Sequence, residues 1–198
     1  LAEVVRRLDG GGRPFRRIVT EDVLGPLGMK DTSMGLRPDL AARRVPVVFR
    51  DKTPGLFDPV LLEATNILFN EETEVPAGGV FSTVSDIFRF ADMLRRKGEL
   101  DGVRLLSPAI VQLAVTNHTG MHPNDLFDYA REMYGWPEWP AYLGLSFFLR
   151  GVGTFPTPLG MTTSPNTFAG LGAGSTVFWV DPERDLTFVC FTAGLLEE

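Results

Sequence analysis

The chain has 198 residues, of which 44% are hydrophobic and 22% charged, a balance ordinary for one soluble globular domain or a large part of one. Its net charge of −6 argues against nucleic acid as a partner, because phosphate binding needs a basic surface. No stretch reaches the roughly 18 apolar residues of a membrane span, and no His, Cys and carboxylate cluster has metal-ligand spacing. We therefore expect no membrane span, no metal and no cofactor.

Two helices are predicted at the start of the chain. Leu1, Val4, Val5 and Leu8 have helical spacing, which predicts a helix over residues 1–8. No start signal precedes it, so we interpret Leu1 as a cut end within a longer chain. A second helix is expected in "FRRIVTEDVLGPLG", residues 15–28. From about residue 37 to residue 74 we expect loops and short pieces, because four prolines interrupt this segment.

The clearest helix is predicted after Thr83. Thr83 and Asp86 have the spacing of a capping box with two reciprocal hydrogen bonds. One apolar face follows, and Gly98 ends the helix; the face consists of Ile87, Phe90, Ala91 and Leu94. Asp101 and Gly102 predict a small hairpin. The pair Ser107 and Pro108 predicts a helix that runs to about Val115.

Residues 120–142 contain two of the three tryptophans and all three tyrosines. Pro137 and Pro140 would break a helix there. Aromatic residues in such a loop can line an apolar cleft as a wall or lid. They can equally form a small satellite core, and the sequence favours neither interpretation.

Consecutive strands are expected near the end, at "LGLSFFLRG", "STVFWV" and "LTFVCFT", with a turn at "DPERD". The last is apolar on both parities, which predicts an inner strand covered on both faces. Gly170, Gly172 and Gly174 are predicted to open the second strand, where glycine often marks a close approach to the backbone. Helices followed by antiparallel strands predict an α+β fold in which helices cover the sheet.

No catalytic nucleophile is visible within the chain. None of the seven serines has a lysine three residues later, and the three tyrosines are not followed by a Tyr-x-Asn pattern. The serines are 33, 82, 85, 107, 146, 164 and 175. A Ser-His-Asp triad would have to use His118 or His122. Cys190 is the only cysteine and is expected to pack as a small hydrophobe, which leaves the redox compartment open.

Four segments carry a resemblance to a known family. "VLGPLGMKDTSMGL", "VPAGGVFSTVSDIFRFADMLRRKGELDGVRLLSPAIVQL", "YLGLSFFLRG" and "GLGAGSTVFWVDPERDLTFVCFT" occur in that order. Together they resemble the serine β-lactamase-like hydrolases, namely class C β-lactamases, penicillin-binding proteins and family VIII-type carboxylesterases, with the esterases nearest. The resemblance implies that residues 1–198 are the C-terminal portion of one β-lactamase/transpeptidase-like domain. It implies that the Ser-x-x-Lys and Tyr-x-Asn motifs and a final helix lie outside this chain.

The same resemblance assigns a role to the glycine stretch. Gly170-Leu171-Gly172 falls at the family's substrate-cleft strand motif, and Ala173 at the position whose backbone N–H serves the oxyanion hole. Gly170 stands where the family carries Lys, His or Trp, which disfavours β-lactam recognition. The implied substrate is a small ester or amide. Three alternatives stay open for the missing part of the enzyme: a second chain, which would then be a partner, an unresolved region, or a part lost from the gene. Two alternatives stay open: glycines that only admit a neighbouring helix, and a non-catalytic binding protein of this fold.

Overall fold

The computed structural model describes residues 1–53, 58–125, 128–155, 157, 159–173 and 175–194. It begins with α1 (Ala2–Leu8) and α2 (Phe15–Val19), and α2 continues directly into a π-helical turn, η1 (Thr20–Leu24). Both N-terminal helices were predicted. The second ends at Leu24, immediately before Gly25-Pro26, and so lies within the predicted range of residues 15–28.

The segment after residue 37 is more ordered than the prolines suggested. It contains a 3₁₀ helix, η2 (Pro38–Arg43), and a ten-residue helix, α3 (Pro59–Leu68). The expectation of loops and short pieces was therefore wrong for α3. Asp58 caps this helix by accepting the Val60 N–H at 2.8 Å, and Pro59 occupies the first turn, where no N–H is needed.

The central helix is α4 (Val84–Arg95), and it begins beside a short antiparallel pair formed by β1 (Ser33–Met34) and β2 (Val80–Phe81). Thr83 caps α4 as predicted, since its hydroxyl accepts the Asp86 N–H. The Asp86 carboxylate does not complete the predicted capping box. It accepts instead from Asp31 and Thr32, on the turn before β1.

A hairpin and a short helix follow α4. β3 (Glu99–Leu100) pairs with β4 (Val103–Arg104) around Asp101 and Gly102, whose φ angles of 50° and 81° suit a primed turn. α5 (Pro108–Ala114) is capped by Ser107, which accepts the Ile110 N–H at 3.2 Å. Both elements confirm the sequence-based prediction.

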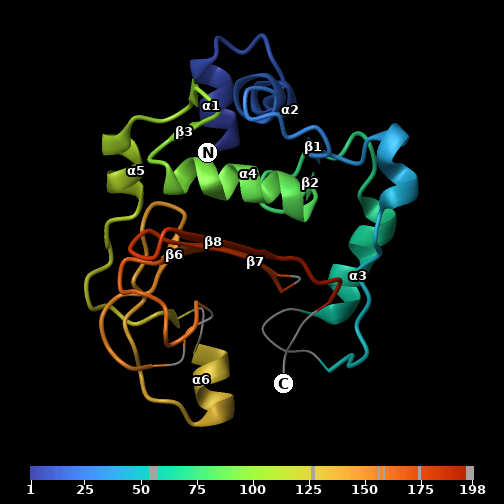
Figure 1. The fold of residues 1–198 in the computed structure, drawn as a ribbon. Coiled ribbons are helices and arrows are strands. Elements are labelled where there is room, and N and C mark those ends of the chain that lie inside the picture. The colour runs from blue at the N-terminus through green and yellow to red at the C-terminus, as the bar shows by residue number, and fades with distance from the viewer. Residues whose placement is uncertain (54–57, 126–127, 156, 158, 174, 195–198) are drawn as a thin grey trace.

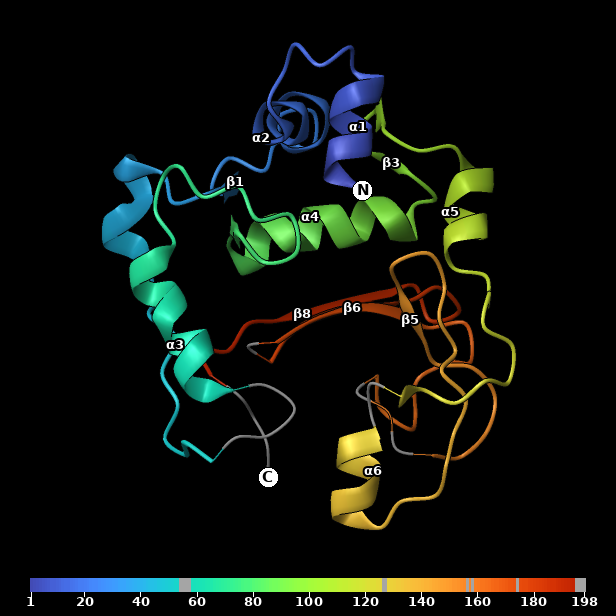
Figure 2. The same ribbon diagram turned by 180° about the vertical axis from the view of Figure 1, so that it is seen from behind.

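The four-stranded sheet is antiparallel throughout and has the order β5-β6-β7-β8. Its strands are β5 (Phe148–Leu149), β6 (Phe168–Gly172), β7 (Thr176–Asp181) and β8 (Leu186–Cys190). α4 crosses one face of the sheet, and α6 (Asp128–Tyr134) lies beyond the other face (Figures 1 and 2). The α+β fold with antiparallel strands and helical cover is thus confirmed.

The last strand differs from its prediction. β8 is the edge strand of the sheet, not an inner strand, and Leu186 and Phe188 are 46% and 41% exposed. These two side chains share the face turned away from α4, whereas Val189 pairs across from Phe178 on the face that α4 covers. Apolar residues on both parities indicated burial on both faces, but only one face of β8 is packed by a described helix.

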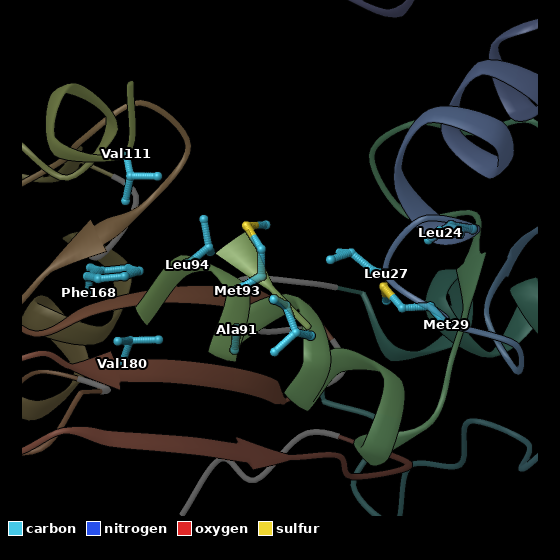
Figure 3. Close-up of a cluster of buried hydrophobic side chains, with 10 residues drawn as sticks. Leu24, Leu27, Met29, Ala91, Met93, Leu94, Val111, Phe168 and Val180 are labelled. Atoms are coloured by element: carbon cyan, nitrogen blue, oxygen red, sulfur yellow. The ribbon is translucent and has the colours of Figure 1, made fainter. Parts of the chain in front are cut away.

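The hydrophobic core lies between α4 and the covered face of the sheet, and extends to the chain around Leu27 (Figure 3). Ala91 and Met93 of α4 are almost completely buried there, as are Phe168 and Val180 of the sheet. This packing fixes the position of β6 and β7 relative to the start of α4. That relative position defines the candidate site.

Candidate active site

A cavity of about 630 Å³ lies beside the β6–β7 hairpin, a volume usual for a small-molecule site. Its walls come from β6 and β7, from β2 and the first turn of α4, and from η2 and α3. Segments far apart in the sequence therefore meet around it. Most of the lining side chains are apolar, including Leu171, Phe81 and Phe178, and a smaller polar group includes Ser82 and three arginines.

The predicted cleft strand lines this cavity. Gly170, Leu171 and Gly172 all belong to its wall. They form the end of β6 and do not open the following strand, as the sequence had suggested; Gly174 lies outside the described residues. Ala173 begins the turn to β7, and within the described part of the chain no acceptor takes its backbone N–H.

Each of the two glycines faces a side chain of β7. Gly170 is paired with Phe178 and Gly172 with Thr176. A Cβ atom at Gly170 would lie 2.4 Å from the Phe178 ring, and one at Gly172 would lie 2.3 Å from Thr176 Oγ1. The close neighbours are therefore cross-strand side chains, and not the helix backbone that we considered. Both glycines line the cavity. Both are also required by packing, because any larger residue would clash with a side chain of β7.

Three arginines make the η2 side of the cavity positive. Arg43 forms an ion pair of 2.9 Å with Asp31, and Arg44 donates to the carbonyls of Thr65 and Phe69 at the end of α3. Arg37 binds Asp39, and its hydrogen bond holds the pKa of that carboxyl below its usual value. All three arginines line the cavity, with Asp31 as the one carboxylate among the described lining residues. The cavity thus disfavours cationic ligands, although the whole chain is acidic.

A chain of hydroxyl groups leads from the cavity to a buried carboxylate. Ser82, which lines the cavity, lies 2.7 Å from Thr32 Oγ1, and Thr32 donates to Asp86 Oδ2 at 2.7 Å. Thr32 and Asp86 are only 5% and 7% exposed. Sequence reasoning missed this arrangement because Thr32 and Ser82 are fifty residues apart, and Asp86 pointed only to a helix cap.

The other candidate residues lie outside the described cavity lining. The Nε2 atom of His118 is hydrogen-bonded to the Leu113 carbonyl. Neither His118 nor His122 is among the described residues that line the cavity, so no Ser-His-Asp triad is assembled at the cavity. Cys190 is half-buried on β8. Among the described residues, no group of His, Cys and carboxylate side chains could hold a metal ion, and no helix is long and apolar enough to cross a membrane.

The aromatic loop forms its own cluster. Trp136 stacks on Tyr134 with ring centroids 4.9 Å apart and lies 5.9 Å from the Trp139 ring. None of these three rings lines the cavity. With Tyr134 and Trp136 47% and 38% exposed, the three rings form a surface cluster, and neither the cavity wall nor the satellite core left open by the sequence describes them.

Comparison with known proteins agrees with this fold. Residues 1–197 match the Beta-lactamase family model. Protein Rv1367c of Mycobacterium tuberculosis is 33% identical over 193 residues, which are 94% of this chain and 44% of that protein. The chain therefore spans less than half the length of this curated relative.

Solved structures give a similar picture. A crystal structure of a beta-lactamase from Mycobacterium bovis matches with 27% identity and a TM-score of 0.62, over 98% of this chain and 53% of the other. A family VIII carboxylesterase matches with 18% identity and a TM-score of 0.65, over 95% of this chain and 48% of the other. The second likeness concerns the fold alone. It agrees with the resemblance that the sequence motifs carried.

Proposed function

Because this chain belongs to the beta-lactamase family, we propose that its cavity is one side of an acyl-transfer site in a serine hydrolase that cleaves esters or related acyl compounds. The proposed site is completed by a Ser-x-x-Lys nucleophile and a Tyr-x-Asn segment from sequence outside residues 1–198. One observation carries the proposal. The strand Gly170–Gly172 borders a cavity of about 630 Å³, and the Ala173 N–H follows at the turn.

In this proposal the Ala173 N–H supports the reaction electrostatically. Attack of a serine hydroxyl on the substrate carbonyl places negative charge on the carbonyl oxygen, and a backbone N–H held in place stabilises that charge. Collapse of the tetrahedral intermediate expels the alcohol and leaves an acyl-enzyme, which water then hydrolyses. Because Gly170 and Gly172 have no side chains, the acyl group can lie against the backbone of β6.

The choice of esters rests on two features. Gly170 provides no side chain to bind the carboxylate of a β-lactam, and the side of the cavity formed by β6 and β7 is mostly apolar, whereas the three arginines line its η2 side. A neutral ester fits the β6–β7 side without desolvating a charge. A likeness to a carboxylesterase supports this choice at the level of the fold.

The test compares two polypeptides, this chain alone and the product of the same coding sequence extended upstream of Leu1. Both are treated with a fluorophosphonate and analysed by intact mass, and their hydrolysis of p-nitrophenyl butyrate is measured. We expect labelling and hydrolysis only in the extended protein, with the adduct on an upstream serine. Labelling of any of the seven serines of this chain would contradict the proposal. An extended protein without Ser-x-x-Lys, label or hydrolysis would favour the non-catalytic binding protein.

A further variant tests Ala173 in the extended protein. Ala173→Pro removes the backbone N–H, whereas Ala173→Ser retains it. Loss of one oxyanion donor lowers turnover by about 100- to 1,000-fold. We expect that loss for the proline variant and a change within a few-fold for the serine variant, with thermal unfolding of both checked by circular dichroism. Equal activity of the two variants would remove Ala173 from the mechanism.

A further inference from the structure

The hydroxyl chain from Ser82 to Asp86 has a defined direction. The Asp86 carboxylate accepts from the Asp31 N–H at 2.8 Å and from the Thr32 hydroxyl at 2.7 Å. A carboxylate accepts hydrogen bonds and donates none. Thr32 has a single hydroxyl proton, and that proton points to Asp86. The 2.7 Å contact between Ser82 and Thr32 therefore requires Ser82 to be the donor.

This direction determines what Ser82 offers to the cavity. Its proton is directed to Thr32, and the alternative acceptor, the Thr83 carbonyl, is 3.4 Å away, beyond the usual O–H···O distance. Ser82 lines the cavity, and among the hydrogen bonds of the described residues none occupies the remaining lone pair of its Oγ, which can accept. Thr32 and Asp86 are buried and fixed by their own partners, so Ser82 cannot reverse its role without breaking the chain.

We propose that Ser82 accepts a hydrogen bond from the hydroxyl group of an alcohol in this cavity, and is thus a specificity-determining residue. The proposal rests on the proposed ester chemistry only in that an alcohol is the product that ester cleavage releases. A neutral O–H donor suits this position better than an ammonium group. Arg37, Arg43 and Arg44 line the same cavity and repel a cation, whereas an alcohol brings its donor on an apolar body that fits the rest of the wall.

Ser82 is not itself assigned as a nucleophile. Its proton is directed to a threonine hydroxyl, which is not a base, and the Ser82–Thr32–Asp86 chain contains no lysine or histidine. The arrangement instead polarises Ser82 as an acceptor, because each hydroxyl that donates becomes a better acceptor.

The inference can be tested by binding alone, without turnover, in the protein extended upstream of Leu1. The probes are 3-phenyl-1-propanol and its methyl ether, which have the same body and differ in the O–H donor. Dissociation constants are measured by NMR titration of the ¹⁵N-labelled extended protein. We expect the alcohol to bind about five- to tenfold more tightly than the ether, the ratio that one net hydrogen bond gives.

Four variants identify the acceptor. Ser82→Ala is expected to bring the alcohol-to-ether ratio close to one. Thr32→Val removes the acceptor for the Ser82 proton, so Ser82 becomes free to donate, the ether gains affinity and the ratio falls. Thr32→Ser keeps the hydroxyl chain and keeps the wild-type ratio. Ser85→Ala, at an exposed position on α4, is the control and leaves the ratio unchanged.

The outcomes separate this inference from the proposed function. Equal binding of the two probes, no binding of either, or a ratio that survives Ser82→Ala each overturns the role of Ser82. Ester hydrolysis by the extended protein is measured independently and is unaffected by these results. A ratio that changes equally in Thr32→Ser and Thr32→Val would mean that Thr32 acts only through packing, and would also overturn the directed chain.

Discussion

The ring of Phe178 occupies the space beside Gly170 on the neighbouring strand. A Cβ atom at Gly170 would lie 2.4 Å from the ring, and the ring is held from the other side by an edge-on contact with Phe90 of α4, at 5.9 Å between centroids. The ring therefore has little room to move away. Position 170 cannot carry a large side chain such as Lys, His or Trp unless Phe178 is repacked, so the identities of residues 170 and 178 depend on each other.

This relationship predicts a coupled pair of substitutions. Gly170→Ala should lower the free energy of unfolding by about 1–3 kcal/mol, the usual cost of overpacking. Phe178→Leu alone should also be destabilising, because it opens a void. The double variant should lose less than the sum of the two, with a coupling of about 0.5–3 kcal/mol. Urea unfolding measures all three variants, and strictly additive losses would show that the two residues do not compete for space.

The cap of α4 should be measurable separately. Thr83→Ala removes the hydroxyl that accepts the Asp86 N–H. We expect a loss of about 1 kcal/mol in the free energy of unfolding. Ser85→Ala, one position beyond the first residue of α4 and exposed, is the matched control and should cost a few tenths at most. Similar losses in the two variants would argue that the hydroxyl of Thr83 does not cap the helix.

Arg150 is buried, and its guanidinium group donates to backbone carbonyls of the loop between β5 and β6. It is 6% exposed and donates to the carbonyls of Gly151, Gly153, Gly160 and Met161 at 3.0–3.2 Å. Arg150→Met leaves these acceptors without their donor, at roughly 1–3 kcal/mol for each that stays dry. We expect a total loss of more than about 3 kcal/mol. Arg50→Met, at an exposed position, is the control; equal effects would contradict a structural role for the Arg150 guanidinium.

Acid should weaken the fold partly through Asp92. Burial by itself would raise the pKa of Asp92, but hydrogen bonds from Arg96 and Arg95 outweigh it and hold the pKa below its usual value. A depressed folded-state pKa contributes stability that is complete above the unfolded value of about 3.9 and is lost as the pH falls through the folded value. Unfolding free energies measured from pH 7 to pH 2 should therefore fall below about pH 4.

Asp92→Asn should flatten this acid limb, because the amide does not titrate. Asp125→Asn, at an exposed position, is the control and should leave the slope unchanged. An acid limb as steep in Asp92→Asn as in the parent would mean that other carboxylates govern the acid sensitivity.

The helices with strong local signals were predictable from sequence. α4 and α5 each begin with a residue whose side chain accepts a hydrogen bond from the first turn, and this signal needs no tertiary information. α3 was missed because the four prolines of residues 37–74 were interpreted as interruptions, whereas Pro59 follows the capping residue Asp58 and starts the helix. The packing of α3 was not predictable either. Glu63 and Asn66 face inward and bind the backbone at residues 47–49, while Leu61 and Ile67 are 67% and 86% exposed.

The candidate site was predictable only in part. The glycine strand was located from its resemblance to a family motif, and it does border the cavity. The hydroxyl chain of Ser82, Thr32 and Asp86 was not, since it depends on the contact between β1 and β2, which are separated by more than forty residues. The structural role of Arg150 was not predictable either, because nothing in the sequence distinguishes a buried arginine from a solvated one.

The exposed edge of β8 should cause this chain to self-associate. β8 is the terminal strand of the sheet, and Leu186 and Phe188 are both exposed on the face opposite α4. An edge strand with apolar side chains pairs readily with another copy, whereas a charge at such an edge prevents pairing. We expect light scattering to show concentration-dependent association of the chain, and Phe188→Lys to reduce it. Glu183→Gln makes the same charge change of +1 in the exposed turn before β8 and controls for net charge. Phe188 also stacks on Trp179 at 5.1 Å, so Phe188→Lys is compared with the parent by thermal unfolding. Equal relief of association by both variants would assign the effect to net charge, and a chain that stays monomeric at high concentration would contradict an open edge at β8.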